Sequence, residues 1–364
     1  MQTIPPDTLP ARRASTSPLL RIEDLAIHFQ TPRGLAQVVD GANLTIYRNE
    51  IFGLAGESGC GKTTLVEAIL QIIRFPNRVA RGRVLFSPNS PDVPEPIDLM
   101  RLSPRQLRRF RWEHISYVPQ GSMNALNPVM RIGEQIIDGM VAHGVSEYEA
   151  RQKVPNLLNK VGLEAKVAQR YPHELSGGMK QRTIIASAIS MDPELIIADE
   201  PTTALDVNVQ RVILETLVTL RREMGIAILI VSHDLPVHAQ LVDRIGIMYA
   251  GQVVEIGDVR SVLKAPLHPY TQGLMDAIPM IGGERTRLSG IGGVAPSPLE
   301  WPSGCRFHPR CPYCPALARD VVPRLVKVRP GLRTVAERER DIGPDRYVAC
   351  HLYSESTPPD GRNV

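Results

Sequence analysis

The residues best suited to chemistry form a glycine-rich run that ends in lysine and threonine. The run reads Gly56-Glu57-Ser58-Gly59-Cys60-Gly61-Lys62-Thr63, followed by Thr64, and it fits the pattern G-x-x-x-x-G-K-[ST]. Glycines let backbone N–H groups curl around an anion, and a helix that begins at the lysine adds the positive end of its dipole. Lys62 would reach the β- and γ-phosphates of a nucleotide, and the Thr63 hydroxyl would ligate Mg²⁺. The run therefore predicts a site for a nucleoside triphosphate with magnesium; the simpler alternative is a glycine turn with a solvated lysine.

Two apolar runs end in polar residues that could act on such a nucleotide. The first, Leu195-Ile196-Ile197-Ala198, is followed by Asp199 and Glu200. Asp199 suits Mg²⁺, directly or through water, and Glu200 is placed to polarise an attacking water as a general base. The second run ends in Val231-Ser232-His233-Asp234, where His233 could contact the γ-phosphate and hold the water in line. The alternatives are ordinary surface acids and a structural histidine at strand ends.

A second glycine pair lies just before the Asp199 strand, in Leu175-Ser176-Gly177-Gly178-Met179-Lys180-Gln181-Arg182. Ser176, Gly177 and Gly178 at the start of a helix would make a second anion cradle. One chain hardly needs two cradles for one phosphate chain. In this run the sequence resembles the ABC ATPases, whose signature is LSGG followed by a basic, Gln-containing helix start. The resemblance implies that the second cradle closes over ATP held by an opposite subunit.

Two further elements resemble the same family and extend the resemblance over about residues 19 to 279. Gln120 is similar to the family's Q-loop glutamine, which implies contact with Mg²⁺, the attacking water and the membrane partner. The run Pro201-Thr202-Thr203-Ala204-Leu205-Asp206 is similar to the D-loop, which implies that Asp206 contacts the other subunit. The adenine is expected to stack on an aromatic residue near the first strand, either Phe29 or, as the weaker candidate, Tyr47. Both could equally be core residues.

Short β-branched runs alternate with segments of helical periodicity, which predicts a central, largely parallel sheet wrapped by helices. The expected strands are 21–29, 42–47, 51–55, 115–118, 195–198 and 226–231, and the expected helices are 62–74, 104–111, most of 133–160, and 209–224. The fold class is therefore α/β. The resemblance specifies a P-loop NTPase ABC cassette with a RecA-like core, an antiparallel β subdomain and a helical subdomain. The expected domains are a disordered tail (1–18), the nucleotide-binding domain (19–280) and a C-terminal extension (281–364).

Composition limits the classes of partner. The 364 residues include 42 basic and 38 acidic ones, a net charge of +4, which is too even to indicate nucleic acid as a main partner. No apolar run approaches the roughly 20 residues that cross a bilayer. The N-terminus has no apolar segment typical of a signal peptide. We therefore expect a soluble cytosolic protein that reaches a membrane only through a partner.

Four of the five cysteines lie in the C-terminal stretch, at Cys305, Cys311, Cys314 and Cys350. In a cytosolic protein such a cluster indicates metal binding before disulfides. Four thiolates suit a [4Fe–4S] cluster or a tetrahedral Zn²⁺ ion, and reduced structural thiols are the third alternative. Relatives place the third cysteine a turn later, where this chain has Ala318, so Cys314 departs from their pattern.

The C-terminal stretch also indicates which kind of ABC protein this is. Three runs resemble the extension of oligopeptide, dipeptide and nickel importer ATPases: Leu267-His268-Pro269-Tyr270-Thr271-Gln272-Gly273-Leu274, Gly304-Cys305-Arg306-Phe307-His308-Pro309-Arg310-Cys311-Pro312-Tyr313, and Val348-Ala349-Cys350-His351-Leu352-Tyr353. The resemblance implies an ATPase that powers peptide import, paired with a second homologous ATPase subunit, two permeases and an extracytoplasmic binding protein. It implies a peripheral position on the cytoplasmic face of the inner membrane. Importers of oligosaccharides or nickel chelates remain alternatives, and a soluble non-transport ATPase is the alternative of another class.

Overall fold

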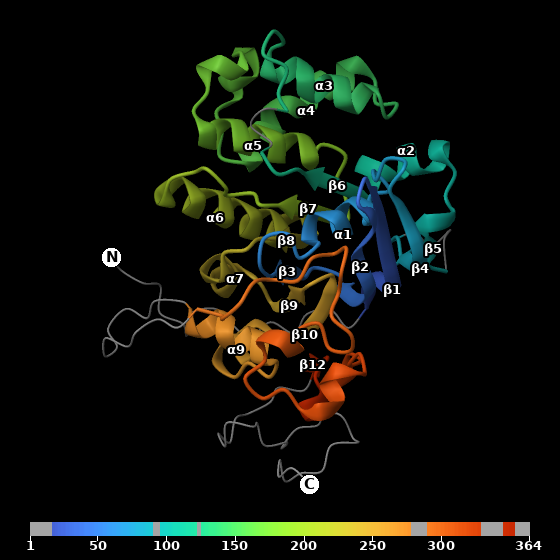
Figure 1. The fold of residues 1–364 in the computed structure, drawn as a ribbon. Coiled ribbons are helices and arrows are strands. Elements are labelled where there is room, and N and C mark those ends of the chain that lie inside the picture. The colour runs from blue at the N-terminus through green and yellow to red at the C-terminus, as the bar shows by residue number, and fades with distance from the viewer. Residues whose placement is uncertain (1–16, 90–94, 122–124, 278–289, 329–344, 354–364) are drawn as a thin grey trace.

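Two β-sheets organise the chain in the computed structural model (Figure 1). The structure describes residues 17–89, 95–121, 125–277, 290–328 and 345–353. Within them, the main sheet has the strand order β11-β12-β10-β9-β3-β8-β7-β6, and a second sheet has the order β2-β1-β4-β5. The expected parallel sheet and antiparallel subdomain are therefore both present.

The parallel part of the main sheet consists of five strands. They are β9 (Arg244–Tyr249), β3 (Ile51–Ala55), β8 (Ala227–Val231), β7 (Leu195–Asp199) and β6 (Ile115–Val118). Every residue of β3, β7 and β8 is buried, as expected for parallel strands covered on both faces. Because the strands run the same way, the segments that follow them meet at one edge of the sheet, which we call the carboxyl edge.

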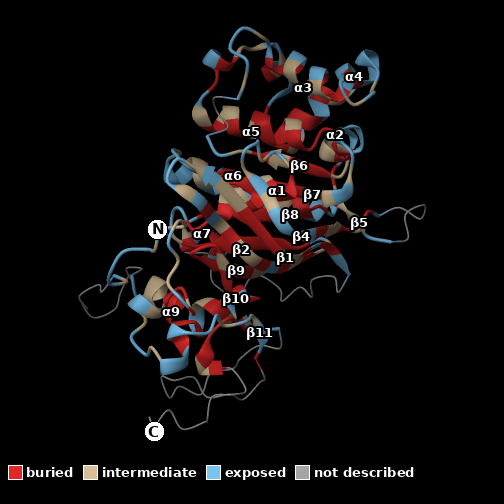
Figure 2. Cartoon of the chain, turned by 45° about the vertical axis from the view of Figure 1, so that its right-hand side comes forward, coloured by how far each residue is buried: buried red, intermediate tan, exposed pale blue. Residues whose placement is uncertain are grey.

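Nine helices lie in the described residues, some against the sheet and some beyond it, and their buried residues face the interior (Figure 2). They are α1 (Lys62–Ile69), α2 (Pro104–Glu113), α3 (Ile132–Val141), α4 (Glu147–Lys160), α5 (Gly177–Ala188), α6 (Val207–Met224), α7 (Leu235–Leu241), α8 (Val259–Lys264) and α9 (Pro269–Asp276). Helices α3, α4 and α5 stack together beyond the β6 side of the sheet, which is the expected helical subdomain (Figure 1). Among the described residues, no helix combines the length and the apolar character that crossing a bilayer requires.

The antiparallel sheet contains the first strands of the chain. Its members are β1 (Pro18–Thr31), β2 (Gly34–Tyr47), β4 (Arg78–Phe86) and β5 (Ile97–Asp98). Strands β1 and β2 form a long hairpin, with Thr31 opposite Gly34 at its turn. Both strands are longer than the sequence predicts. The expected tail 1–18 lies mostly outside the described residues, and β1 already begins at Pro18.

One expected helix is shorter than predicted. The prediction ran from residue 62 to 74, but α1 ends at Ile69. Gln71 adopts a positive φ of 49°, which takes the chain out of the helix before β4. The guanidinium of Arg111 donates to the carbonyls of Leu70 and Gln71, each at 2.8 Å, and so satisfies acceptors that a longer helix would have bonded itself.

The C-terminal extension continues the main sheet. Strand β12 (Tyr347–Val348) pairs with β10 (Gln252–Asp258), and β11 (Val326–Lys327) pairs with β12. Arg346 and Glu255 form an ion pair in which both side chains are buried. The predicted domain boundary at 280/281 lies outside the described residues. The remaining regular elements are short 3₁₀ turns at Leu99–Arg101, Ala165–Gln169, Pro172–Glu174, His308–Arg310, Ala316–Arg319 and His351–Tyr353.

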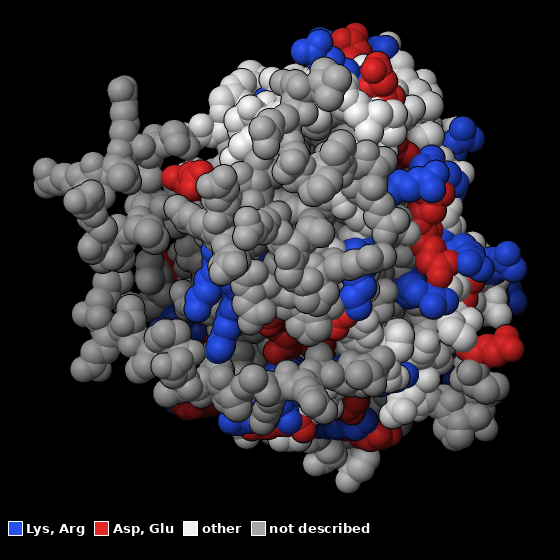
Figure 3. All heavy atoms as spheres, turned by 90° about the horizontal axis from the view of Figure 1, so that it is seen from below, with Lys and Arg blue, Asp and Glu red and all other residues white. Residues whose placement is uncertain are grey.

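Charges of both signs share the surface. In the view from below, Lys and Arg side chains lie beside Asp and Glu on the described part of the face (Figure 3). This mixture matches the nearly even count of acids and bases in the sequence.

Candidate functional site

The glycine-rich run connects β3 to α1 as the sequence predicts. Gly61, the residue before the helix, has a φ of 103°, a region that glycine adopts without strain. A Cβ atom at Gly56 would lie 2.1 Å from the Met248 carbonyl oxygen, so that position also requires glycine. The Lys62 ammonium is buried and donates to the carbonyls of Gly56 and Glu57 at 2.8 and 3.0 Å. The lysine charge is thereby held inside the curl of the loop, where phosphate oxygens would bind.

The other predicted loop residues have different surroundings. Ser58 and Gly59 are exposed, whereas Thr63 and Thr64 on the first turn of α1 are half-buried. Cys60 is buried, and its sulfur lies 3.8 Å from the Lys62 nitrogen. Burial raises the pKa of the Cys60 thiol, so the side chain is neutral and adds no charge to the phosphate site.

Asp199, the last residue of β7, carries the donor atoms for a magnesium ion. Its side chain is fully buried, and neither carboxylate oxygen has a hydrogen-bond partner among the described residues. Burial raises the pKa of Asp199, and the nearby Thr63 hydroxyl lowers this pKa by a smaller amount. A buried carboxylate without a partner is costly unless a cation completes its surroundings. Asp199 and Thr63 together therefore fit Mg²⁺, as the sequence predicts.

Glu200 and His233 meet at the carboxyl edge. His233 Nδ1 lies 2.6 Å from Glu200 Oε1, and the His233 backbone N–H donates to the same oxygen at 3.2 Å. The Thr203 hydroxyl donates to Glu200 Oε2 at 3.0 Å. Glu200 itself has a positive φ of 49°, a strained conformation of the kind found at functional sites. The fold thus holds the carboxylate in one orientation beside the phosphate loop.

Three other predicted residues, Gln120, Asp206 and Ser176, make no hydrogen bond with Glu200 or His233 in the part of the chain that the structure describes. Gln120 is exposed after β6, at the same edge of the sheet. Asp206 caps α6, where its carboxylate accepts from the backbone N–H groups of Asn208 and Val209 at 3.1 and 3.0 Å. Ser176 caps α5 by accepting from Met179 N at 3.4 Å, and its side chain is exposed.

The Ser176-Gly177-Gly178 turn makes no hydrogen bond with the chain's own phosphate loop in the described residues. Gly177 is half-buried. Gly178 is buried against α6, since a Cβ there would lie 2.4 Å from Val209. The serine-capped start of α5 is thus formed as predicted, and Ser176 is exposed to solvent.

The two aromatic candidates for adenine stacking have different positions. Tyr47 ends β2 beside the start of β3, opposite the phosphate loop, and the Arg244 guanidinium lies over its ring at 5.0 Å. Phe29 lies near the β1–β2 turn, pairs with Ala36 and is half-buried. This arrangement leaves Phe29 as the better placed of the two.

The structure places three further residues, His238, Tyr270 and Arg310, beside the predicted site, and no sequence pattern indicates a role for them there. His238 on α7 is fully buried and contacts the Ser232 carbonyl through Nε2 at 3.2 Å, directly before His233. Tyr270 and Arg310 both contact Glu57 of the phosphate loop. Tyr270 and Arg310 lie in the C-terminal runs that resemble importer ATPases. They are 213 and 253 positions from Glu57 in the chain, so no local pattern indicates that they contact the loop.

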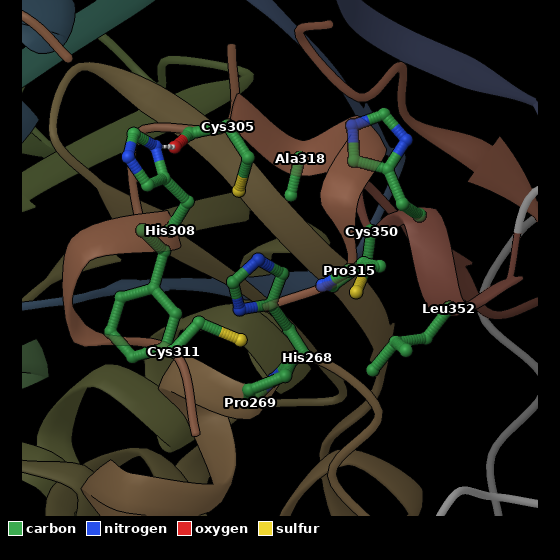
Figure 4. Close-up of a pocket in the computed structure, with 11 residues that line it drawn as sticks. His268, Pro269, Cys305, His308, Cys311, Pro315, Ala318, Cys350 and Leu352 are labelled. Carbon is green, nitrogen blue, oxygen red and sulfur yellow. Dashed lines mark hydrogen bonds between the residues drawn. The ribbon is translucent and has the colours of Figure 1, made fainter. Parts of the chain in front are cut away.

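A second site lies in the C-terminal extension, where a small cavity of about 10 Å³ has room for about one water molecule. Cys305, Cys311 and Cys350 line it, and their sulfur atoms turn toward its interior around the His268 ring (Figure 4). His308 also lines it and holds its Nδ1 at 3.0 Å from the Cys305 carbonyl. Three of the four predicted ligands are thus brought together from two separate segments.

The fourth predicted ligand is not on the cavity wall. Ala318 lines the cavity, and Cys314 does not. The departure from the relatives' spacing therefore leaves an alanine methyl group where a fourth thiol would be expected. Within the described ranges, no three His, Cys, Asp or Glu side chains converge as one metal ion would require. The thiols suit a metal centre by their chemistry, but this structure does not assemble a set of four.

Burial and backbone N–H groups act in opposite directions on the three thiols of this cavity. Burial raises the pKa of each, and that of Cys350 to about 12. Backbone N–H groups act against this effect by donating toward the sulfurs. In each case one donor is two residues further along: Phe307 for Cys305, Tyr313 for Cys311 and Leu352 for Cys350.

Comparison with known proteins gives two family matches. The family described as ABC transporter matches residues 39–203, and the family described as Oligopeptide/dipeptide transporter, C-terminal region, matches residues 254–316. The first includes the phosphate loop, Asp199 and Glu200. The second includes Tyr270, Cys305 and Cys311.

Similar relatives match over most of their length. The Dipeptide transport ATP-binding protein DppD of Caldanaerobacter subterraneus is 36% identical over 343 residues, covering 93% of this chain and 98% of the relative. A Putative peptide import ATP-binding protein of Brucella abortus is 41% identical, covering 83% and 89%. The Escherichia coli DppD is 38% identical, covering 84% and 92%.

Solved structures match the cassette part. A dimeric ATP-binding cassette in a post-hydrolysis state, bound to ADP and Pi, gives a TM-score of 0.58 at 26% identity and covers 66% of this chain and 99% of that one. A cbiO1 protein of Clostridium perfringens, part of an ABC transporter complex, gives 0.57 at 29% identity and covers 68% and 92%.

Proposed function

Because this chain belongs to the ATP-binding proteins of oligopeptide/dipeptide ABC transporters, we propose that ATP hydrolysis at the carboxyl edge of its main sheet powers peptide import through partner permeases. The chain is the ATP-hydrolysing subunit of such an importer. The roles of its individual residues follow from the geometry of that edge.

The phosphate loop binds the nucleotide. Its backbone N–H groups and the Lys62 ammonium contact the β- and γ-phosphates, and the α1 dipole adds favourable charge. Phe29 stacks on the adenine. Thr63, Asp199 and Gln120 would hold Mg²⁺, which would supply positive charge beside the phosphate oxygens.

Glu200 is the general base, and the observation that carries this role is its 2.6 Å contact with His233. Glu200 accepts the proton of the attacking water as the water's oxygen bonds to the γ-phosphorus. His233, bound through Nδ1, has Nε2 free to face the γ-phosphate and keep the water in line. The hydroxyls of Thr203 and Ser232 donate to Glu200 Oε2 at 3.0 and 3.5 Å and keep the carboxylate aimed at that position.

Each ATP is closed by a second polypeptide. Ser176, Gly177 and Gly178 form a cradle at a helix start, exposed at its serine, which suits phosphates presented by another cassette. We place a second homologous ATPase subunit there, with Asp206 at the contact. Closure of the pair moves permease helices docked near residues 120–131, at the cytoplasmic face of the inner membrane, and an extracytoplasmic protein supplies the peptide.

Glu200→Gln tests this mechanism in the full transporter. We expect the variant to bind ATP as the wild type does but to hydrolyse it at least about 100-fold more slowly, because the amide accepts no proton. Nucleotide binding and phosphate release are measured separately. Glu215→Gln, an exposed residue of α6 paired with Arg211, is the matched control and should keep normal turnover. Near-normal hydrolysis by Glu200→Gln would remove Glu200 from the role of base.

The cysteine cavity is a structural metal centre in this proposal. Three thiols with backbone N–H donors aimed at their sulfurs suit thiolates bound to metal. A set of sulfur ligands suits an iron–sulfur cluster, with Zn²⁺ as the alternative. Cys305, Cys311 and Cys350 would hold the [4Fe–4S] cluster, and Cys314 would reach it only after a local rearrangement.

A further inference from the structure

The second residue of the phosphate loop, Glu57, is held by the C-terminal extension. Arg310 Nη1 donates to Glu57 Oε2 at 3.2 Å, and Arg310 Nη2 donates to Oε1 at 3.3 Å. Paired contacts of this kind fix both the distance and the orientation of a carboxylate. The two residues are 253 positions apart in the chain, so only the tertiary fold brings them together.

Arg310 is itself fixed in place. Its Nε donates to the Gly292 carbonyl at 2.8 Å, and its Nη2 donates to the Ile291 carbonyl at 3.3 Å. Nη1 also contacts the Tyr249 hydroxyl at 3.3 Å. The side chain is only 6% exposed. A guanidinium bound on so many sides acts as a rigid support, unlike a solvated surface arginine.

Tyr270 holds the backbone of the same loop residue. The Glu57 N–H donates to the Tyr270 hydroxyl at 2.9 Å. Tyr270 is fully buried, and its ring packs against that of Tyr249 with 4.4 Å between centroids. The Glu57 carbonyl in turn accepts from Lys62 Nζ at 3.0 Å. The backbone N–H, the side chain and the carbonyl of Glu57 therefore all form hydrogen bonds. The carbonyl bonds directly to Lys62, the lysine proposed to bind phosphate.

We propose that Arg310 and Tyr270 are positioning residues for ATP binding, which act through Glu57 to hold the phosphate loop and Lys62 in the receptive shape. Neither residue touches the position of the reacting phosphate. The folded extension thus orders the phosphate loop before the nucleotide binds. ATP binding then does not have to supply the free energy of ordering the loop, so the affinity for ATP is higher. Loss of either contact weakens ATP binding more than it slows the chemical step.

The test measures ATP affinity, KM and kcat on full-length variants. We expect Arg310→Gln to weaken ATP binding by about tenfold, within the usual range of coupling between sites, and to change kcat by less than about threefold. Arg310→Lys keeps the charge without the paired geometry and should recover part of the affinity. Tyr270→Phe removes only the acceptor for the Glu57 N–H and should also raise KM.

Coupling between Arg310 and Glu57 separates positioning from general destabilisation. The double variant Glu57→Gln, Arg310→Gln should weaken ATP binding by less than the sum of the two single effects, because each substitution removes the same Glu57–Arg310 contact. Lys327→Gln breaks an exposed ion pair of the same extension with Asp345 and is the matched control, with unchanged affinity. Thermal unfolding of each variant shows whether it is folded.

Wild-type ATP affinity in folded Arg310→Gln would overturn the proposal, as would strictly additive effects of the two substitutions. If Arg310→Gln fails to fold, Arg310→Lys and Tyr270→Phe decide the question, and wild-type KM in both would overturn it. A fall in kcat with unchanged KM would also contradict it, because the residues would then act on the chemical step. Each of these results is independent of whether Glu200 is the base.

Discussion

The carboxyl edge of the main sheet and the cysteine cavity of the extension are built in opposite ways. At the edge, each functional group directly follows its own strand, as Glu200 follows β7 and His233 follows shortly after β8. In the cavity, Cys350 follows the short strand β12, whereas Cys305 and Cys311 lie in a segment far from it in the chain that contains only short 3₁₀ turns. A sheet edge aligns its groups through the strands, whereas the cavity depends on how separate loops pack.

The two regions also differ in the free-energy cost of their buried polar and thiol groups. Asp199 at the edge is a buried carboxylate with no hydrogen-bond partner among the described residues, which costs stability. The cavity thiols are neutral when free, because burial raises their pKa, and neutral thiols cost little to bury. The edge therefore contains a group whose burial costs stability, whereas burial of the free thiols costs little. Arg310, next to Cys311 in the chain, connects one region to the other through Glu57.

Asp199→Asn should give the largest effect and would sharpen this comparison. We expect ATP hydrolysis to fall by at least about 100-fold as Mg²⁺ binding is weakened. The melting temperature should stay the same or rise, because an unpaired buried charge is removed. Asp243→Asn is the matched control. Its carboxylate accepts from Ile51 N at 2.8 Å and pairs with Arg221, so this variant should lose stability and keep ATP hydrolysis.

Cys350→Ser should give the next largest effect, on stability more than on hydrolysis. Wild-type protein purified without oxygen should be brown and absorb near ~400 nm, as iron–sulfur proteins do. The variant should lose bound metal and become less stable by about 2–5 kcal/mol, because metal binding contributes to folding. Cys314→Ser should keep both. A colourless wild-type protein with one zinc per chain would favour the zinc alternative, and loss of metal in Cys314→Ser would restore that residue as a ligand.

The smallest expected effect is on the pH dependence of stability. Burial lowers the pKa of His238 from 6.5 to about 4, so the folded state disfavours the imidazolium that the unfolded chain accepts freely. The resulting stability is fully present above about pH 6.5 and is lost as the pH falls toward about 4. In His238→Gln, which keeps a donor for the Ser232 carbonyl, this loss of stability should shrink by on the order of 3 kcal/mol.

Chemical unfolding of His238→Gln at several pH values measures the effect. His173→Gln, at an exposed position, serves as the control and should keep the wild-type pH profile. Equal slopes in wild type and His238→Gln would show that other groups carry the acid sensitivity of the nucleotide region.

Much of the fold and of the nucleotide site follows from local patterns. The runs that form β3, β7 and β8 are apolar and β-branched because both faces of the sheet are covered, and this is visible in sequence. The length of α1 was not visible, because its end depends on Arg111, about forty residues away. The choice between Phe29 and Tyr47 for stacking stays a prediction, and the structure adds that the Arg244 guanidinium lies over the Tyr47 ring.

The sequence by itself determined which chemical groups are present: a glycine loop with a lysine, a carboxylate pair and a histidine at strand ends, and a C-terminal set of thiols. Each of these depends on neighbouring residues, whose spacing sets their relative positions along a strand or a turn. Only the tertiary structure decided that Ala318 rather than Cys314 lines the cavity, and that Arg310 and Tyr270 support Glu57. Contacts between distant segments depend on how whole elements pack against the core, and no local spacing encodes that geometry.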